Sequence, residues 1–258
     1  LPASRIDLAK INYNVWYGHT SHGNQITVGM GQLSDPYTYS LDGAGGTLSY
    51  QELAGHDLGS LGDTGWVTTT RNKLNEATND RNVVMWSWCG GVSDNTEQGI
   101  NTYLDAMTQL EIEYPGVRFI YMTGHLDGGG ASGNLHQRNE QIRAYCRTHK
   151  KILFDFADIE RYDPDGTDFL DLSADDECDY DHGNWADEWC AANPGSHLCD
   201  HCEDGCNHSR SLNCNIKARA FWWMMARLAG WNPSPVPCPD FPGPSPVIRD
   251  VDFPADAN

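Results

Sequence analysis

An apolar run gives way to a polar turn in the stretch Val15-Trp16-Tyr17-Gly18-His19-Thr20-Ser21-His22-Gly23. Its apolar part, residues 13–17, predicts a buried strand that ends at Gly18. Many α/β enzymes present a nucleophile where such a strand meets a turn, at the carboxyl edge of the sheet. A histidine beside a hydroxyl group is also the pairing that activates serine or threonine. The alternative interpretation is a polar turn whose hydroxyl groups cap the next helix.

Three further apolar runs predict buried parallel strands at residues 83–88, 117–122 and 152–156. Between them, apolar residues recur at helical spacing and predict helices over 96–114 and 139–149. This alternation predicts the α/β class: a single three-layer domain with a parallel sheet of about five strands.

The other segments complete the expected domain. Residues 24–63 are rich in Gly, Ser, Asp and Tyr, so we expect long loops there, followed by a short helix around 68–77. A last helix is expected at 216–228. These elements predict one domain over residues 1–232 and an extended, proline-rich tail over 233–258.

Composition limits the partners. The chain has 258 residues and a formal net charge of −19, which argues against nucleic acid or an anionic membrane as a partner. No apolar run approaches the ~20 residues that span a bilayer. We therefore expect a secreted monomer that acts away from the membrane.

Seven of the nine cysteines fall within residues 178–238, and those at 178–214 lie in predicted loops. This density favours disulfides formed in an oxidising compartment. The competing interpretation is a zinc site, because the C-x2-C-x3-C run at 199–206 resembles ligand spacing. Nine is an odd number, so at least one thiol is unpaired; Cys89 and Cys146 are the candidates.

Each predicted strand is followed by residue types that carry chemistry: His19, Ser21 and His22; Ser87, Trp88 and Cys89; His125 and Asp127; Asp158 and Glu160. Because the carboxyl ends of parallel strands meet at one edge, these groups predict a site on a single rim of the sheet.

The order of these motifs resembles the SGNH (GDSL-type) hydrolase superfamily over residues 12–231. The family's Gly-Asp-Ser turn is similar to residues 18–21, with histidine in place of aspartate and one extra residue. The Gly-x-Asn-Asp block falls at 86–91, where the oxyanion-binding asparagine is missing. The Asp-x-x-His block is matched by 204–208, one residue longer. The resemblance implies an SGNH or flavodoxin-like fold and serine esterase chemistry.

The resemblance also implies roles for single residues. Ser21 is the expected nucleophile, with Thr20 as the alternative. His208 is the expected base and Asp204 the group that orients it. Backbone N–H groups of the turn, with Ser87, are expected to bind the oxyanion.

Three histidines, His19, His22 and His125, have no single place in such a triad. Imidazoles on one rim could bind a metal, hold a carboxylated sugar, or act as acid and base in a β-elimination beside Asp127. For His19 we favour hydrogen bonds that pin a loop.

Tryptophan supplies the expected sugar contacts. The chain has nine tryptophans, and Trp66 in a loop and Trp88 near the rim are candidates for stacking on a sugar ring. No cofactor is expected to be required. The stretch 163–168 puts side-chain oxygens at alternate positions around a glycine turn, and its aspartates Asp163, Asp165 and Asp168 are the candidate ligands of a structural calcium ion. The alternative interpretation is an acidic turn without a metal.

Three functions remain open. The first is a carbohydrate esterase or deacetylase that acts on a polysaccharide through Ser21. The second is a polysaccharide lyase or glycosidase that uses His22, His125 or His208 with Asp127. The third is a non-catalytic carbohydrate-binding module. For the enzymes, we expect the serine and these three histidines to share one cleft.

Overall fold

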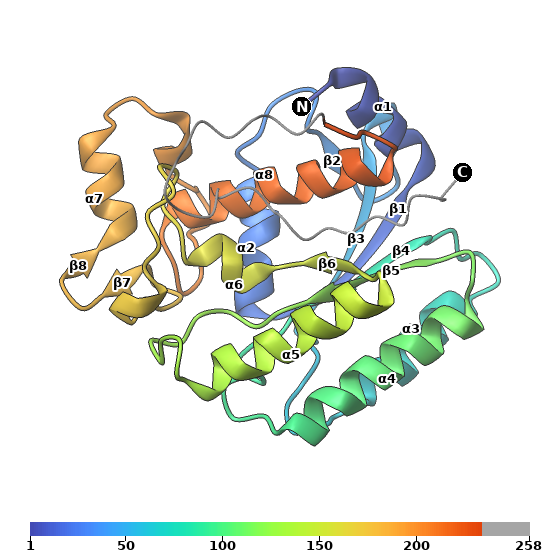
Figure 1. Ribbon diagram of the computed structural model, residues 1–258. Helices are drawn as coiled ribbons and strands as arrows, with labels where there is room; N and C mark the ends of the chain where they lie inside the picture. Colours follow the sequence, from blue (N-terminus) through green and yellow to red (C-terminus); the bar gives the residue numbers. More distant parts are fainter. Residues whose placement is uncertain (234–258) are drawn as a thin grey trace.

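The computed structural model describes residues 1–233, which form a six-stranded parallel sheet in the order β2-β3-β1-β4-β5-β6 (Figure 1). The strands are β1 (Asn14–His19), β2 (Tyr39–Ser40), β3 (Leu48–Ala54), β4 (Val83–Trp86), β5 (Arg118–Met122) and β6 (Ile152–Phe154). All neighbours pair in parallel, including β4 with β5. The predicted parallel α/β sheet is therefore confirmed, with one strand more than expected.

Helices cover both faces of the sheet (Figure 1). One face carries α1 (Ala3–Asn12), α2 (Ser21–Met30) and α8 (Ser211–Leu228). The other carries α3 (Gly65–Leu74), α4 (Glu97–Glu113) and α5 (Asn134–His149). The expected three-layer architecture is thus confirmed. Among the described helices, none combines the length and the apolar character that a membrane crossing needs.

The strand order reverses between β1 and β4. From β1 the chain crosses through α2 to β3 on one side, and it then returns to β4 on the other side. With β2 set aside, the order β3-β1-β4-β5-β6 is that of flavodoxin-like sheets. Ligands of such sheets bind beyond the carboxyl ends of the strands at this reversal point. The reversal therefore places the end of the opening stretch where a ligand site is expected.

Continuous apolar strands make the core. All four side chains of β4 are buried, as expected of a strand covered on both faces. Gly18 permits a close approach between neighbouring strands, because a Cβ atom there would overlap the Trp86 ring. The glycine that ends the apolar run of β1 is thus required by packing.

The expectation of loops over residues 24–63 is wrong, because this segment contains most of α2 and all of β3. Helix α2 has polar residues and two glycines, so its sequence is a weak helix signal. Packing stabilises it instead: Gly29 lies so close to α8 that a Cβ atom would overlap the Cys214 carbonyl oxygen. Strand β3 pairs along its length with β1. Tertiary contacts therefore decide both elements.

The segment after β6 holds short elements: α6 (Phe156–Glu160), η2 (Leu170–Leu172), β7 (Asp179–Tyr180), β8 (Gly183–Asn184), α7 (Trp185–Ala192) and η3 (His197–Cys199). A further short helix, η1 (Ala44–Gly46), precedes β3. Figure 1 shows β7, β8 and α7 together at one end of the sheet. Apart from Pro233, the expected tail over 233–258 lies outside the described residues.

Two disulfides tie this region, Cys190–Cys199 and Cys206–Cys214. They contradict a zinc site at 199–206, because the first and last cysteines of that run are in different disulfides. The described thiols without a disulfide are those of Cys89, Cys146, Cys178 and Cys202. The first two were the predicted free cysteines. Cys178 and Cys202 are buried thiols in a region where we expected mostly disulfides, and Cys238 lies outside the described residues.

Candidate active site

Ser21 is the first residue of α2 and lies directly beyond the carboxyl end of β1. The first intrahelical hydrogen bond runs from Asn24 N to Thr20 O, so the N–H groups of residues 21–23 point out of the helix end. These N–H groups and the helix dipole create a positive potential beside the Ser21 hydroxyl group. The turn therefore offers both a hydroxyl group and donors for an anion.

The structure brings Ser21 and His208 into contact, although 187 positions separate them in the sequence. The His208 Nε2 atom lies 3.1 Å from Ser21 Oγ, which is hydrogen-bond distance. His208 belongs to the loop before α8 and has a left-handed backbone, with a φ of 55°. This contact is the one that a histidine base needs in order to take a proton from serine.

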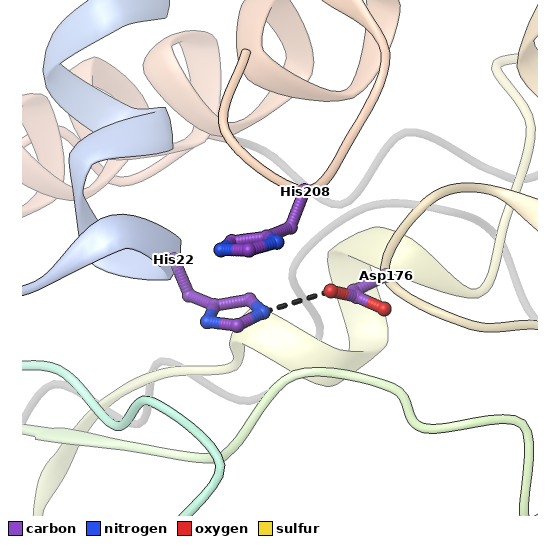
Figure 2. A group of neighbouring side chains, drawn as sticks. All are labelled: His22, Asp176 and His208. Carbon is purple, nitrogen blue, oxygen red and sulfur yellow. Dashed lines mark hydrogen bonds and ion pairs between the residues drawn. The ribbon is translucent and has the colours of Figure 1, made fainter.

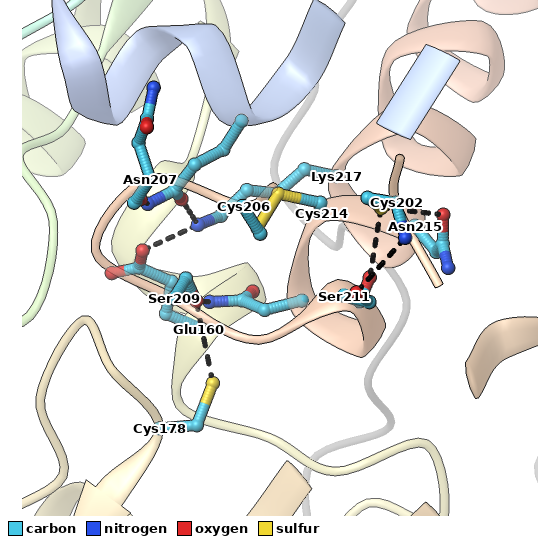
Figure 3. The surroundings of a disulfide bond; sticks show 12 residues. Glu160, Cys178, Cys202, Cys206, Asn207, Ser209, Ser211, Cys214, Asn215 and Lys217 are labelled. Atoms are coloured by element: carbon cyan, nitrogen blue, oxygen red, sulfur yellow. Dashed lines mark hydrogen bonds and ion pairs between the residues drawn. A yellow bond between two sulfur atoms is a disulfide. The ribbon is translucent and has the colours of Figure 1, made fainter. Parts of the chain in front are cut away.

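Two links hold the loop that carries His208. The Cys206–Cys214 disulfide joins it to the first turns of α8. From α2, the Gln25 side chain donates a hydrogen bond to the Asn207 carbonyl oxygen at 2.5 Å. Figure 3 shows the disulfide and Asn207 in this loop. The residue before the histidine is thereby fixed to the helix that carries the serine.

A buried ion pair lies behind these contacts. Lys217 Nζ of α8 is 2.5 Å from Glu160 Oε1 and also donates to Gln25 Oε1, and neither charged side chain is exposed. Burial lowers the pKa of Lys217, and the Glu160 charge opposes this shift. The other Glu160 oxygen accepts the Leu126 N–H at 2.7 Å. One buried pair therefore connects α2, α6, α8 and the segment after β5.

His22 lies beside this serine–histidine pair and contacts two other functional groups. Its Nε2 atom is 2.8 Å from Asp176 Oδ2 (Figure 2), and its Nδ1 atom is 3.1 Å from Cys89 Sγ. Burial lowers the pKa of His22, while the hydrogen bond to Asp176 opposes the shift. Burial raises the pKa of Asp176, but the His22 hydrogen bond and the charges of His125 and His22 together outweigh it, so that pKa lies below its usual range. His22 is therefore neutral at pH 7, with its proton on Nε2.

His125 packs against His22 but has both ring nitrogens engaged. The two rings stack with their centroids 3.8 Å apart. The His125 Nε2 atom accepts the Gly90 N–H at 3.2 Å, so Nδ1 carries the proton and donates it to the Leu126 carbonyl oxygen at 2.6 Å. This arrangement positions His125 as a support for His22. Proton transfer through His125 would first have to break one of these bonds.

The expected orienting group, Asp204, has no hydrogen bond to His208 in the described part of the chain. Asp176 is the carboxylate near the histidines: its oxygen and nitrogens of His22 and His208 lie within 4.8 Å of one another. Sequence reasoning missed Asp176, because nothing local distinguishes it from the other acidic residues of the chain. Only the fold shows that the loop at 175–177 reaches the rim.

His19 and Ser87 are structural in this arrangement. His19 is 3% exposed, and its Nε2 atom is 2.8 Å from Glu52 Oε1, so it pins β1 to β3. Ser87 is 1% exposed and lies under the first turn of α2, where a Cβ atom at Gly23 would overlap its hydroxyl group. Ser87 therefore does not face a substrate at the rim.

The two tryptophans expected to bind sugar are part of the core. Trp66 and Trp88 are 3% and 4% exposed, and their indole N–H groups donate to backbone carbonyl oxygens. Stacking on a sugar would require them to leave the core. Asp127 is exposed, and its carboxylate accepts the Gly129 N–H at 2.9 Å. Of these three residues, Asp127 alone is accessible.

Two places could hold a metal by residue type. At the first, His22, Asp176 and His208 are close together, but the His22 and His208 rings stack with an angle of 14° between their planes. A histidine lone pair lies in the ring plane, so the lone pairs of these two stacked rings lie in separate, nearly parallel planes and do not converge on one ion. Binding a metal through both rings would require one of them to rotate.

The second place is the turn at 163–168, and its carboxylates already have partners. Asp163 Oδ1 accepts two backbone N–H groups, and Asp165 Oδ2 accepts the Trp189 indole N–H. Asp168 forms an ion pair with Arg161. The three carboxylates stabilise the turn and do not form a shared cage of oxygen ligands of the kind calcium prefers.

Comparisons with protein-family models, with curated proteins and with solved structures return no match. The class of the protein therefore rests on its own geometry. It is a parallel α/β domain with a serine–histidine pair at the reversal point of the sheet.

Proposed function

We propose that the protein is a secreted serine esterase that removes acyl groups from a polysaccharide. The observation that carries this proposal is the 3.1 Å contact between Ser21 Oγ and His208 Nε2 at the end of a helix that offers free N–H donors. A hydroxyl group, a base and an anion site are the three parts that acyl transfer needs.

In this mechanism Ser21 attacks the carbonyl carbon of the acyl group while His208 takes the hydroxyl proton. Negative charge develops on the carbonyl oxygen and is stabilised by the N–H groups at the start of α2. His208 then donates its proton to the departing sugar hydroxyl group. A water molecule, deprotonated by His208, releases the acid from the Ser21 ester.

Asp176 supports the base through His22. The His22 ring stacks on the His208 ring with centroids 4.7 Å apart. Its Nε2 atom donates a hydrogen bond to the Asp176 carboxylate. When His208 becomes positively charged, the Asp176 carboxylate near it stabilises that charge. In this proposal Asp176 takes the role that the family resemblance implied for Asp204.

Charge and cysteine chemistry support the substrate and the compartment. A net charge of −19 repels acidic polymers, so a neutral acylated polysaccharide fits this surface better than an acidic one. The two disulfides suit an oxidising, extracellular environment. The lyase alternative gains less support, because both nitrogens of His125 are already hydrogen-bonded and Asp127 caps a turn.

The test measures release of acetate from acetylated xylan and from a small aryl acetate. Ser21→Ala and His208→Ala are each expected to lower turnover about 10³-fold or more. Ser132→Ala, which removes an exposed hydroxyl group, serves as the matched control and is expected to retain full activity. Unchanged acetate release by Ser21→Ala would overturn the proposal. Chain cleavage without acetate release would instead favour a lyase or glycosidase.

A further inference from the structure

A second nucleophile lies next to the serine. Cys89 follows β4, the strand on the other side of the reversal point, and its Sγ atom is 3.1 Å from His22 Nδ1. His22 in turn donates its Nε2 proton to Asp176. We propose that Cys89, His22 and Asp176 form a thiol-reactive centre that undergoes exchange with small neutral or cationic disulfides.

The order of these contacts is thiol, imidazole, carboxylate. In this order the imidazole accepts the thiol proton and the carboxylate fixes the tautomer and stabilises the imidazolium that forms. His22 has the required protonation, since its Nε2 proton faces Asp176 and its free Nδ1 lone pair faces the thiol. This relay shares Asp176 and the stacked His22 ring with the proposed esterase site, but its base is His22, whereas the base for Ser21 is His208.

The other free thiols lack these properties. Cys146, Cys178 and Cys202 are buried, and burial raises the pKa of each, to about 12 for Cys178. A buried thiol with a raised pKa is inert, because the thiolate is the nucleophile. Cys89 is half-buried at the rim and is the described free thiol that both meets a base and remains accessible.

The exchange step balances without a further reagent. The Cys89 thiol transfers its proton to His22, and the thiolate attacks one sulfur of the small disulfide. A new bond forms between Cys89 Sγ and that sulfur, while the original disulfide bond breaks. The leaving thiolate takes the proton from His22. The acidic surface disfavours anionic disulfides, which is why the proposed reagent is neutral or cationic.

Exchange at Cys89 has a consequence for Ser21, and this consequence rests on the proposed esterase function. The two side chains are neighbours, with Cys89 Sγ 3.5 Å from Ser21 Oγ. A group attached to the sulfur therefore occupies the space in which an acyl group would approach the serine. We expect the mixed disulfide to stop ester turnover, and a small thiol that removes the group to restore it.

The test uses 2,2′-dithiodipyridine with the intact folded protein and follows the released pyridinethione by its absorbance. We expect one fast equivalent, mapped to Cys89 by peptide mass. His22→Gln and Asp176→Asn should slow this phase at least tenfold at pH 7, and Cys89→Ser should remove it. Cys146→Ser, the matched control at a buried thiol, should keep it.

A pH series tests the base directly and needs no variant to interpret it. With His22 as the base, the wild-type rate should change less than threefold between pH 7 and pH 8. A thiol without a base gains thiolate about eightfold over this interval, because an ordinary cysteine pKa is about 8.5. A rise of threefold or more in the wild-type protein, or a Cys89 no faster than the buried thiols, would overturn the proposal. Ser21→Ala, which removes ester turnover, should still show the fast labelling phase at Cys89, so labelling and esterase activity can fail separately.

Discussion

The two halves of the Ser21–His208 pair are held in different ways. Ser21 begins a helix that packs tightly on its neighbours through glycines, and it follows a strand in the middle of the sheet. His208 belongs to a loop held by a disulfide, by one hydrogen bond from Gln25, and by the buried Lys217 behind it. Close packing of regular elements therefore positions the nucleophile, whereas a few long-range links position the base.

Of the changes that test how each half is held, removing the buried Lys217 cation should have the largest effect on stability. Lys217→Met leaves Glu160 buried without its partner, which we expect to lower the free energy of unfolding by about 3–5 kcal/mol. Urea unfolding measures the loss, and adding Glu160→Gln should recover part of it. Lys73→Met, which breaks the ion pair with the half-exposed Glu76, is the control and should cost less than about 1 kcal/mol. Equal losses for the two lysines would contradict the importance of the buried pair.

Loosening the packing between α2 and α8 affects Ser21, the nucleophile half of the pair. Gly29→Ala places a methyl group against the Cys214 carbonyl oxygen, so α2 and α8 must separate, at a cost of about 1–3 kcal/mol. Thermal unfolding should show the decrease. A Cβ atom at Gly116 would meet nothing within 4 Å, so Gly116→Ala should be neutral. Equal melting temperatures for both variants and the wild-type protein would contradict the packing argument.

Removing each disulfide in turn separates an effect on stability from an effect on ester turnover. Replacing Cys206 and Cys214 by serine should lower the free energy of unfolding by about 2 kcal/mol and also reduce ester turnover, because the His208 loop loses its tie to α8. The matched pair, Cys190 and Cys199, closes a loop of similar length that does not contain that histidine. Its removal should cost similar stability and leave turnover unchanged. An equal loss of turnover in both variants would show that the tie between the His208 loop and α8 does not control ester turnover.

Acid should weaken the fold through His22. Because burial lowers the pKa of His22, the unfolded chain binds a proton that the folded protein does not. Stability is therefore complete above the ordinary histidine pKa of about 6.5 and falls as the pH decreases below it. The slope from this group is at most about 1.4 kcal/mol per pH unit. Between pH 7 and pH 5, the free energy of unfolding of His22→Gln should depend less steeply on pH than that of the wild-type protein. An equal slope would show that another group takes up the proton.

The sequence was informative where a local pattern decides the structure. The apolar runs at 83–88 and 117–122 predicted β4 and β5, and the glycine-bounded turn placed Ser21 at the strand end. Helix α2 and strand β3 were missed because their residues carry weak local signals. Packing against α8 and pairing with β1 determine these elements, and neither contact is visible in the segment itself.

The same limit applies to the candidate site. Ser21 and His208 could be proposed from the order of motifs, and the structure brings them together. Asp176 could not be proposed, because its role depends on a loop reaching the rim from 154 positions beyond His22. Trp66 and Trp88 were predicted to contact a sugar, and the structure shows both buried in the core. An aromatic residue near a predicted turn can be buried as readily as exposed, so the sequence alone does not decide between the two.

The unequal lengths of the strands have a consequence for behaviour at high concentration. The outermost strands, β2 and β6, contain two and three residues, whereas the inner strands β1 and β3 contain six and seven. A long outer strand can recruit a second chain by extending the hydrogen-bond ladder, and such recruitment begins many aggregates. Strand β2 pairs only with Leu48 and Ser49, so residues 50–54 of β3 have no described strand on that side. The exposed Glu52 lies in this part of β3, and a charged side chain on an open edge opposes the addition of a second chain. Crowded molecules of this protein should therefore stay dispersed, even though a sheet forms the centre of each one.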